Sequence, residues 1–365
     1  MNENREELEE RISYLENKIL ELEQKNLSYA KERDSIFQAI RNISDINNQV
    51  LVHISGMIND QSVLDMNQKI TKAKCDNLGY ELLDSRIRGS YFFPVIRSAE
   101  ETIEEIIQNG KSIARFGDGE FAQIVKMERH KFQKLDDKLA LRLEEVLHSH
   151  HPNMLIAIAD NYGTLQDYAE SAANAIRFYM VGGETRRQHM ELLERDRIYY
   201  NAYVSRPYVM YKDSMTDAPK KRFEHLKKIW DNRNLMIVEG AQTRMGVGND
   251  LLDNAKDIKC ILAPATNSFD RYDDIWKAAL EYAKEDTLFL IAIGPSAGVL
   301  AYDLTVEGYQ ALDIGHLDLE YEWFLAGKGQ RTPIPYKYNN EVEGGDAVEQ
   351  LRDPAYEGQI VASCV

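Results

Sequence analysis

The first fifty residues place apolar side chains at alternating steps of three and four, the spacing of a heptad repeat. With Leu8 at position d, the apolar a positions are Ile12, Ile19 and Ile40, and the early d positions are Leu8, Leu15 and Leu22. Isoleucine at a with leucine at d favours a parallel pair of helices, and Asn26 at a fixes the register. Arg33 and Asn47 weaken the later a positions. We therefore predict a coiled coil over residues 1–50, forming a homodimer. A single helix folded onto the rest of the chain and a coil that recruits another chain are the alternatives.

Further along, the pattern changes to short apolar runs, each followed by a polar or glycine-containing loop and then by helical spacing. The runs are residues 112–116, 154–159, 235–238, 258–262 and 287–293. Nearly continuous apolar strands that alternate with helices predict a parallel sheet covered on both faces. The predicted fold class is α/β, with a Rossmann-like, mostly parallel sheet and helices on both faces, preceded by the coiled coil.

These patterns divide the chain into four predicted parts. Between the coil and the sheet, residues 51–85 have a mixed, helical composition and are predicted to form a connector. Residues 86–335 form the predicted catalytic domain. The chain then becomes rich in Gly, Pro and Asn with scattered charge, so residues 336–365 are predicted to be a flexible tail.

Composition narrows the classes of partner. A net charge of -16 argues against nucleic-acid binding, which needs a basic surface. An acidic protein can still bind an anionic ligand through a metal ion or a helix N-terminus. The three cysteines are too few and too scattered for a disulfide framework or a zinc site. We see neither a signal peptide nor the ~20 apolar residues of a membrane span, and expect a cytoplasmic protein.

The strand predicted at 112–116 leads into a glycine-rich turn that carries Asp118 and Glu120. In parallel sheets, ligands bind beyond the carboxyl ends of the strands. Two carboxylates two positions apart on such a turn can face one crevice, and they suit a hard divalent cation. The alternative is a helix N-terminus at which acidic residues simply oppose the helix dipole.

A second polar cluster lies within residues 311–324. Its titratable members are Asp313, His316, Asp318, Glu320 and Glu322. A solvated helix start accounts for the two glutamates, but not for His316 between two aspartates after a glycine. His316 and Asp318 are therefore candidates for a catalytic base or a second metal contact, with Glu320 as an alternative base.

Three function classes compete. A dinucleotide-dependent enzyme should show Gly-x-Gly-x-x-Gly directly after a strand, but Gly246-Val247-Gly248 comes too late and lacks the third glycine. A non-catalytic nucleotide-binding or coiled-coil scaffold protein explains the coil alone. A metal-assisted transferase explains more: Asp118 and Glu120 would hold a cation against a donor pyrophosphate, where the cation acts as a Lewis acid. A carboxylate near the acceptor would remove the hydroxyl proton.

Four segments resemble the GT-D type glycosyltransferase family, formerly a domain of unknown function, over roughly residues 90–330. They are Arg115-Phe-Gly-Asp118-Gly-Glu120, Pro264-Ala-Thr-Asn267-Ser-Phe269, Gly294-Pro-Ser296 and the segment from Asp313 to Phe324. The family occurs in bacterial surface-glycan and adhesin glycosylation loci. The resemblance implies transfer of a glucose-like hexose from a UDP-sugar, with Mn²⁺ or Mg²⁺, to a glycan, glycopeptide or lipid-linked acceptor.

By the same resemblance, Asp118 and Glu120 are the metal and diphosphate motif, and Arg115 contacts phosphate, orients the carboxylates or forms a structural salt bridge. The residues implied to contact the nucleotide are Gly246, Gly248, Asn267, Gly294 and Ser296. Asn267 has capping of the next helix as its alternative. Glu239 and Gln242 are expected to face the sugar donor or the acceptor. We expect inversion, because no nucleophile is obvious.

Overall fold

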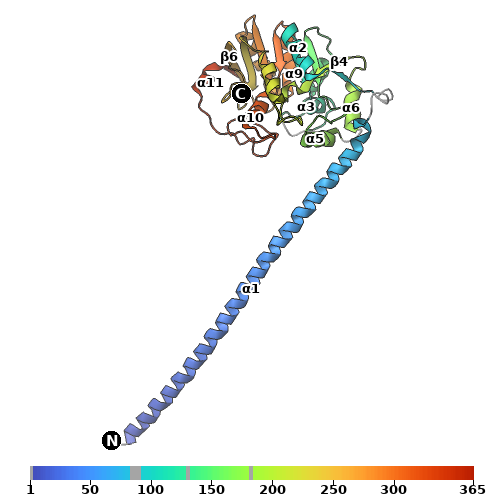
Figure 1. The fold of residues 1–365 in the computed structure, drawn as a ribbon. Coiled ribbons are helices and arrows are strands. Elements are labelled where there is room, and N and C mark those ends of the chain that lie inside the picture. Colours follow the sequence, from blue (N-terminus) through green and yellow to red (C-terminus); the bar gives the residue numbers. More distant parts are fainter. Residues whose placement is uncertain (1–2, 83–91, 129–131, 181–183) are drawn as a thin grey trace. The chain divides into compact units, whose positions relative to one another are not determined.

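The computed structural model describes residues 3–82, 92–128, 132–180 and 184–365, and the chain forms two compact units, Met1–Thr71 and Lys72–Val365 (Figure 1). The start predicted for the catalytic domain, residue 86, lies outside these residues. The first unit belongs to one uninterrupted helix, α1 (Glu3–Glu81). Residues 51–81 are therefore helical, as predicted for the connector, and they continue the helix of the first fifty residues without a break. Among the helices of the described residues, none is long and apolar enough to cross a membrane.

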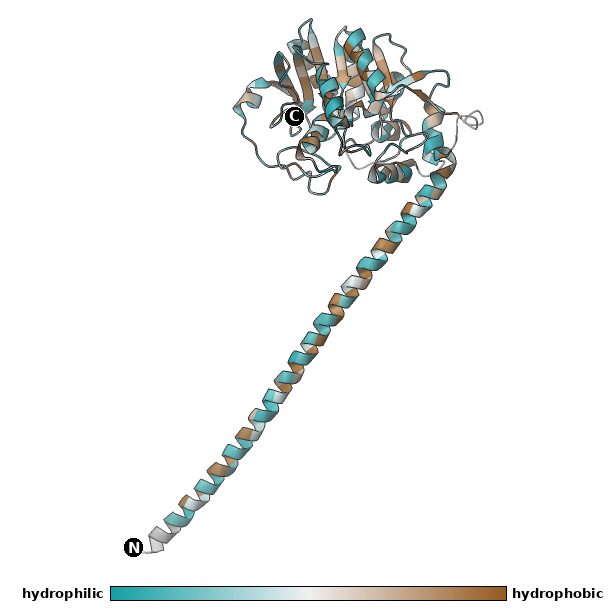
Figure 2. Cartoon of the chain, in the orientation of Figure 1, coloured by the Kyte–Doolittle hydropathy of each residue, from teal (hydrophilic) through white to brown (hydrophobic). Residues whose placement is uncertain are grey.

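The apolar stripe of α1 continues well beyond residue 50. In the register predicted for the coil, positions a and d of the next heptads hold Val50, Ile54, Met57 and Leu64, and all four side chains are exposed. Figure 2 shows apolar residues recurring along this helix among polar ones. Exposed apolar side chains at heptad spacing are suited to pairing with a partner helix, so the predicted coil would extend into this part of α1.

The second unit is built on a parallel sheet. The strands, within the described residues, are β1 (Val95–Ile96), β2 (Ser112–Phe116), β3 (Met154–Ile158), β4 (Ile198–Asn201), β5 (Asn234–Gly240), β6 (Asp257–Ala263), β7 (Thr287–Ala292), β8 (Gln310–Asp313) and β9 (Ile360–Ser363). They pair in the order β1-β4-β3-β2-β8-β7-β5-β6-β9, each pair parallel. The predicted parallel sheet is confirmed.

Helices cover both faces of this sheet. They are α2 (Ala99–Asn109), α3 (Asp118–Ile124), α4 (Asp137–Leu147), α5 (Glu170–Met180), α6 (Glu184–Leu192), α7 (Ala218–Lys227), α8 (Tyr272–Tyr282), α9 (Ser296–Val306), α10 (Leu317–Ala326) and α11 (Pro354–Gln359). One core contains α3, α4, α5, α8 and α9, and the other contains α2, α7, α10 and α11. Successive strand residues alternate between the cores, as the pleat requires: Ile113 joins one and Ala114 the other.

The segment 336–365, predicted to be a flexible tail, is instead folded into the second unit. It contains α11, and β9 extends the sheet by pairing with β6 from Cys260↔Ile360 to Leu262↔Ser363. The side chain of Lys337 is fully buried. The Gly- and Asn-rich composition of this segment reflects loops that cross the protein surface between short elements.

The central strands β2 and β8 define where a ligand can enter. The strands that follow β2 in the chain, β3 and β4, lie on one side of it, and β8 and β7 lie on the other. Ligands of open parallel sheets bind in the crevice that forms where the strand order changes direction in this way. The turn with Asp118 follows β2 and the turn with His316 follows β8, so both emerge at this crevice.

Candidate functional site

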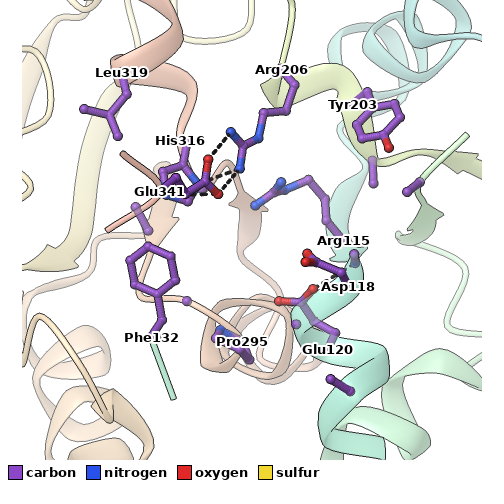
Figure 3. Close-up of a pocket in the computed structure, with 18 of the residues that line it drawn as sticks. Arg115, Asp118, Glu120, Phe132, Tyr203, Arg206, Pro295, His316, Leu319 and Glu341 are labelled. Carbon is purple, nitrogen blue, oxygen red and sulfur yellow. Dashed lines mark hydrogen bonds and ion pairs between the residues drawn. The ribbon is translucent and has the colours of Figure 1, made fainter. Parts of the chain in front are cut away.

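A cavity of about 670 Å³ lies at the carboxyl edge of the sheet. Its walls include the turns after β2 and β8, the segment after β4, the loop before α9 and the segment that follows α10 (Figure 3). The volume falls within the range of about 300–1,000 Å³ that is usual for small-molecule sites. The sequence placed three of these five wall segments at the site and missed the ones after β4 and α10.

The turn after β2 places two carboxylates on the cavity wall. The backbone N–H of Gly117 donates to Oε2 of Glu120 at 2.8 Å, so the Glu120 side chain caps the start of α3. Figure 3 shows the carboxylates of Asp118 and Glu120 beside one another. Burial, and then the nearby charge of Asp313, raise the pKa of Glu120 to about 7. Glu120 therefore serves the helix N-terminus, which was the alternative for this turn, while its carboxylate also lies beside that of Asp118 on the cavity wall.

Arg115 joins the two central strands. Its Nη2 pairs with Oδ1 of Asp313 at 2.5 Å, its Nε donates to the Asp313 carbonyl at 2.7 Å, and its Nη1 donates to Oγ of Ser205 at 2.6 Å. Gly315 has φ +46°, and a Cβ there would overlap the Arg115 guanidinium, so only glycine fits. The structural salt bridge, one of the alternatives for Arg115, is present, while contact with phosphate stays a prediction.

An ion pair that the sequence did not reveal crosses the cavity. Arg206 donates from Nη1 and Nη2 to the two carboxylate oxygens of Glu341, at 2.8 and 2.6 Å. Burial opposes ionisation of Glu341, but the charge and hydrogen bonds of Arg206, together with the charge of Arg331, hold the pKa of this carboxyl well below its ordinary value. Glu341 escaped the sequence analysis because it lies in the segment taken for a flexible tail. Arg206 follows β4 without a motif.

His316, a candidate base, does face the cavity. Its Nδ1 accepts a hydrogen bond from Nη2 of Arg206 at 3.1 Å, and its Nε2 lies 3.9 Å from Oε1 of Glu341. Burial lowers its pKa to about 3, so the imidazole is neutral near pH 7. Because Nδ1 is the acceptor, the proton of the neutral ring belongs on Nε2. In this arrangement His316 is a hydrogen-bond donor toward a ligand, and proton removal by it stays a prediction.

Asp318, a second candidate base, is buried among internal partners. It accepts hydrogen bonds from Nζ of Lys337 at 2.6 Å, from Nδ2 of Asn249 at 2.9 Å and from the backbone N–H of Gly246 at 2.9 Å. Lys337 also pairs with Glu322 at 2.9 Å. These contacts anchor the chain after α10 to the loop after β5, which is a structural arrangement.

Glu320, the alternative base, is also fully buried. One carboxylate oxygen, Oε2, accepts the backbone N–H groups of Tyr208 and Val209 at 3.1 and 3.0 Å, and Oε1 lies 3.8 Å from Arg206. Burial raises the pKa of Glu320. Its contacts fix the segment after β4 against α10, and so place Arg206 at the cavity.

Of the five residues implied to contact the nucleotide, Gly294 lines the cavity. The other four make packing contacts or internal hydrogen bonds. Gly246 donates to Asp318, Gly248 packs against the Tyr336 hydroxyl, Asn267 accepts from the backbone of Lys134, and Ser296 accepts from Ser268. Asn267 is therefore a brace for the loop that carries Phe132. Contact with a nucleotide stays a prediction for all five.

Glu239 and Gln242, which were predicted to face the donor or the acceptor, also make internal contacts. Glu239 is fully buried, where its oxygens accept from the N–H of Met245 and the hydroxyl of Tyr356, each at 2.8 Å. Burial raises the pKa of Glu239 to about 7. The backbone carbonyl of Gln242 accepts from the N–H of Tyr338 at 2.9 Å. Both contacts hold the chain after α10 close to the cavity.

The donor set decides which kind of metal site fits. Among the residues that the structure describes, no three His, Cys, Asp or Glu side chains are grouped to hold a metal ion. Asp118 and Glu120 offer two carboxylates. Mg²⁺ and similar hard cations are commonly held by one or two carboxylates, with substrate phosphates and water completing the shell. The residues therefore fit a cation shared with a bound diphosphate, and do not form an all-protein cage.

Comparison with known proteins agrees with this geometry. A family model described as the glycosyltransferase GT-D fold matches residues 113–342. A probable glycosyl transferase, Gly, of Streptococcus gordonii is 35% identical over 73% of this chain and 38% of its own length. Glycosyltransferase GlyD of Streptococcus pneumoniae is 34% identical over 73% of this chain and 32% of its own length. The chain thus spans about a third of the length of these curated relatives.

Comparison with solved structures points to the same family. A structure described as a new glycosyltransferase (DUF1792) from Streptococcus sanguinis is 33% identical, with a TM-score of 0.68, and the match covers 74% of this chain and 99% of that one. Another, described as a domain of unknown function 1792 with a distinct glycosyltransferase fold, is 32% identical, with a TM-score of 0.69, over 74% and 95% of the two chains. The chain belongs to the GT-D fold glycosyltransferase family.

Proposed function

We propose that this glycosyltransferase moves a glucose-like hexose from a UDP-sugar to a hydroxyl of a glycan, glycopeptide or lipid-linked acceptor in bacterial surface-glycan synthesis. The observation that carries the proposal is the composition of the cavity wall: two adjacent carboxylates on one turn, facing a cavity that is also lined by Arg115, Arg206 and Arg331. A diphosphate needs positive charge on several sides, which arginine side chains and a carboxylate-bound cation together supply.

In this proposal Asp118 and Glu120 hold Mn²⁺ or Mg²⁺ together with the donor diphosphate. When bound, the cation acts as a Lewis acid that stabilises charge on the departing UDP. Arg206, which lies between Glu341 and His316, binds a phosphate oxygen and keeps the Nδ1 atom of His316 occupied. His316 then donates from Nε2 to an oxygen of the substrate.

Inversion is the proposed stereochemical course, and it requires a base that removes the proton of the acceptor hydroxyl. Asp318 lines the cavity, but both of its carboxylate oxygens accept internal hydrogen bonds. Glu320 is fully buried, where Oε2 accepts backbone N–H groups and Oε1 lies 3.8 Å from Arg206. A base is therefore sought among the other groups that line the cavity. NMR of the anomeric proton of the product, compared with the donor, decides between inversion and retention.

The first test is isothermal titration of UDP into the full chain with and without Mn²⁺, with NAD as the comparison ligand. We expect UDP binding that requires Mn²⁺, and no binding of NAD. Mn²⁺-dependent binding should fall by at least about tenfold in Asp118→Asn, because the variant loses a charged ligand of the cation. Asp137→Asn is the matched control, because Asp137 is exposed and pairs with Lys126.

The outcomes separate the function classes. No UDP binding by a folded protein favours the scaffold alternative, and binding of NAD favours a dinucleotide-dependent enzyme. A large fall in melting temperature of Asp118→Asn, with UDP binding unchanged, assigns Asp118 a structural role instead.

A further inference from the structure

A second cavity of about 860 Å³ opens at the same edge of the sheet. Its walls come from the segments after β1, β3 and β4, which are the three strands on the far side of β2. Carboxyl ends of parallel strands meet at one edge of a sheet, so the second cavity neighbours the first. The mechanism proposed above uses none of the residues that are particular to it.

The wall of this second cavity is aromatic. Tyr168 lies at the centre, with its ring centroid 5.7 Å from Tyr203 and 5.5 Å from Tyr211. The rings of Tyr203 and Tyr211 are half-buried, and Phe93 lines another side. Aromatic faces carry negative charge density, which attracts the positively polarised C–H groups of a sugar ring. Tyr168 itself is buried, and the Arg222 guanidinium lies over the Tyr211 ring, 4.5 Å from its centroid. The half-buried ring of Tyr203 and the open part of Tyr211 are therefore the surfaces suited to such stacking.

Charged groups of both signs surround these rings, because Lys221 and Lys228 line the cavity together with several carboxylates. Glu100 and Asp167 are exposed at the cavity. Two of the basic groups there are already paired: Arg222 forms a bidentate pair with Asp213 at 2.6 and 2.8 Å, and His225 lies 2.8 Å from Glu104. Carboxylates accept hydrogen bonds from hydroxyl groups, so Glu100 and Asp167 suit a hydroxyl-rich ligand.

Tyr203 and Asn161 lie where the two cavities meet. Tyr203 lines both cavities, and Asn161 lines the first while its chain neighbours Asp160 and Tyr162 line the second. Asn161 donates from Nδ2 to the Tyr203 hydroxyl at 3.3 Å. Its Oδ1 is buried and has no hydrogen-bond partner among the described residues. Buried acceptors without a partner are uncommon, and a ligand hydroxyl at this junction would supply the missing donor.

We propose that the second cavity binds the acceptor, a neutral glycan whose sugar rings stack on the tyrosine wall and whose reacting hydroxyl reaches the first cavity beside Tyr203 and Asn161. The inference rests on the proposed function, because it needs a sugar donor in the first cavity. It assigns the two substrates to different walls: arginines and a carboxylate-bound cation for the charged donor, and tyrosines with rim carboxylates for the uncharged acceptor.

The test is saturation-transfer-difference NMR on the full chain, with maltose and cellobiose as neutral disaccharide probes and glucose 1-phosphate as an anionic one. UDP and Mg²⁺, a diamagnetic cation that does not broaden the NMR signals, are kept at saturation so that the first cavity is filled. We expect disaccharide signals that persist under these conditions. They should fall at least threefold in the double variant Glu100→Ala with Asp167→Ala, and also in Tyr211→Ala.

The matched control is Glu281→Ala with Glu285→Ala, which removes the same charge from exposed positions near the start of β7, at the amino edge of the sheet. Two results overturn the inference: disaccharide signals that UDP and Mg²⁺ abolish, and signals that the second-cavity variants leave unchanged. If neither disaccharide gives a signal, the inference is also overturned. Mn²⁺-dependent UDP binding, measured in parallel, tells whether the proposed function fails as well.

Discussion

At the scale of single residues, Lys337 shows how a charge can be held inside this protein. Its side chain is fully buried, and its ammonium group lies 2.6 Å from Asp318 and 2.9 Å from Glu322. Burial alone would lower its pKa, but these two carboxylates raise it, so the lysine is charged. Removing one member of a buried ion pair leaves the other charges uncompensated.

We therefore expect Lys337→Met to lower the free energy of unfolding by about 3–5 kcal/mol, since two buried carboxylates lose their cation. Lys328→Met, at an exposed position, is the control and should change it by less than about 0.5 kcal/mol. Urea denaturation followed by circular dichroism measures both. A change below about 1 kcal/mol in Lys337→Met would show that water reaches the carboxylates.

Glu239 gives a prediction about pH. Its pKa is raised to about 7 by burial, whereas an unfolded glutamate titrates near 4.3. Between these values the folded state binds more protons than the unfolded state, so the contribution of Glu239 to stability falls as the pH rises. Glu239→Gln removes this loss. The free energy of unfolding of Glu239→Gln minus that of the wild type should therefore be larger at pH 8 than at pH 5, by on the order of 2 kcal/mol.

The measurement is chemical denaturation of both proteins at pH 5 and pH 8. The amide can still accept from Met245 and can donate to the Tyr356 hydroxyl, so packing is kept. If the difference between the two proteins is the same at both pH values, Glu239 titrates normally.

The candidate site was predictable from the sequence where its residues share one local turn. Asp118 and Glu120 lie on the cavity wall because a strand, a glycine-rich turn and a helix follow one another in the chain. Asp318 and Glu320 lie as close together in sequence, yet their partners come from distant segments, Lys337 and the backbone of Tyr208. Only the folded chain brings such partners together, so a buried anchor and a base look alike in the sequence.

At the scale of elements, α1 carries a stripe that nothing in its own unit covers. The a and d positions from Ile12 to Leu64 are largely apolar and exposed. A second copy of the helix in parallel covers such a stripe most simply. The pairing brings two catalytic units to one polymeric acceptor, which raises their effective concentration there. Homodimer formation through this coil is a proposal.

We expect Ile19→Asp to raise the dissociation constant of the dimer at least about tenfold, because a carboxylate enters the apolar seam. Leu20→Asp is the matched control: it makes the same kind of change one position away, at b, where Leu20 is also exposed. Analytical ultracentrifugation measures the masses. Ile54→Asp tests the extension beyond residue 50, and an unchanged dimer in this variant would show that the coil ends earlier.

Elements were predictable where they are long and strongly patterned. The runs at 112–116, 154–159, 235–238, 258–262 and 287–293 correspond to β2, β3, β5, β6 and β7. The edge strand β9 was missed, since its apolar run Ile-Val-Ala is only three residues long and its structure depends on pairing with β6. Short edge strands owe their structure to a neighbour more than to their own sequence.

At the scale of the whole molecule, the order of the strands could not be predicted. Ile113 in β2 pairs with Leu312 in β8, two positions that lie far apart in the chain. The apolar pattern shows that a strand is buried, but it does not show which strand lies next to it. The carboxyl edge as the ligand side was predictable, because it follows from parallel pairing alone.

The folded segment 336–365 leads to a prediction about truncation. Deleting these residues removes β9, Lys337 and Glu341, so we expect the sheet edge to be exposed and the cooperative thermal transition to be lost. Deleting residues 1–71 is the control and should leave the transition of the second unit within about 5 °C. A sharp transition in the first variant would contradict the structural role of the segment.

The place of Lys337 and Glu341 in the chain has a consequence for biosynthesis. A ribosome makes α1 before any strand of the sheet, whereas the residues that complete the cavity wall and the β9 edge come after all the other strands. Domains generally fold in the order of their synthesis. The helices of neighbouring nascent chains on one messenger RNA can therefore pair while their catalytic units are still incomplete, so that assembly precedes activity.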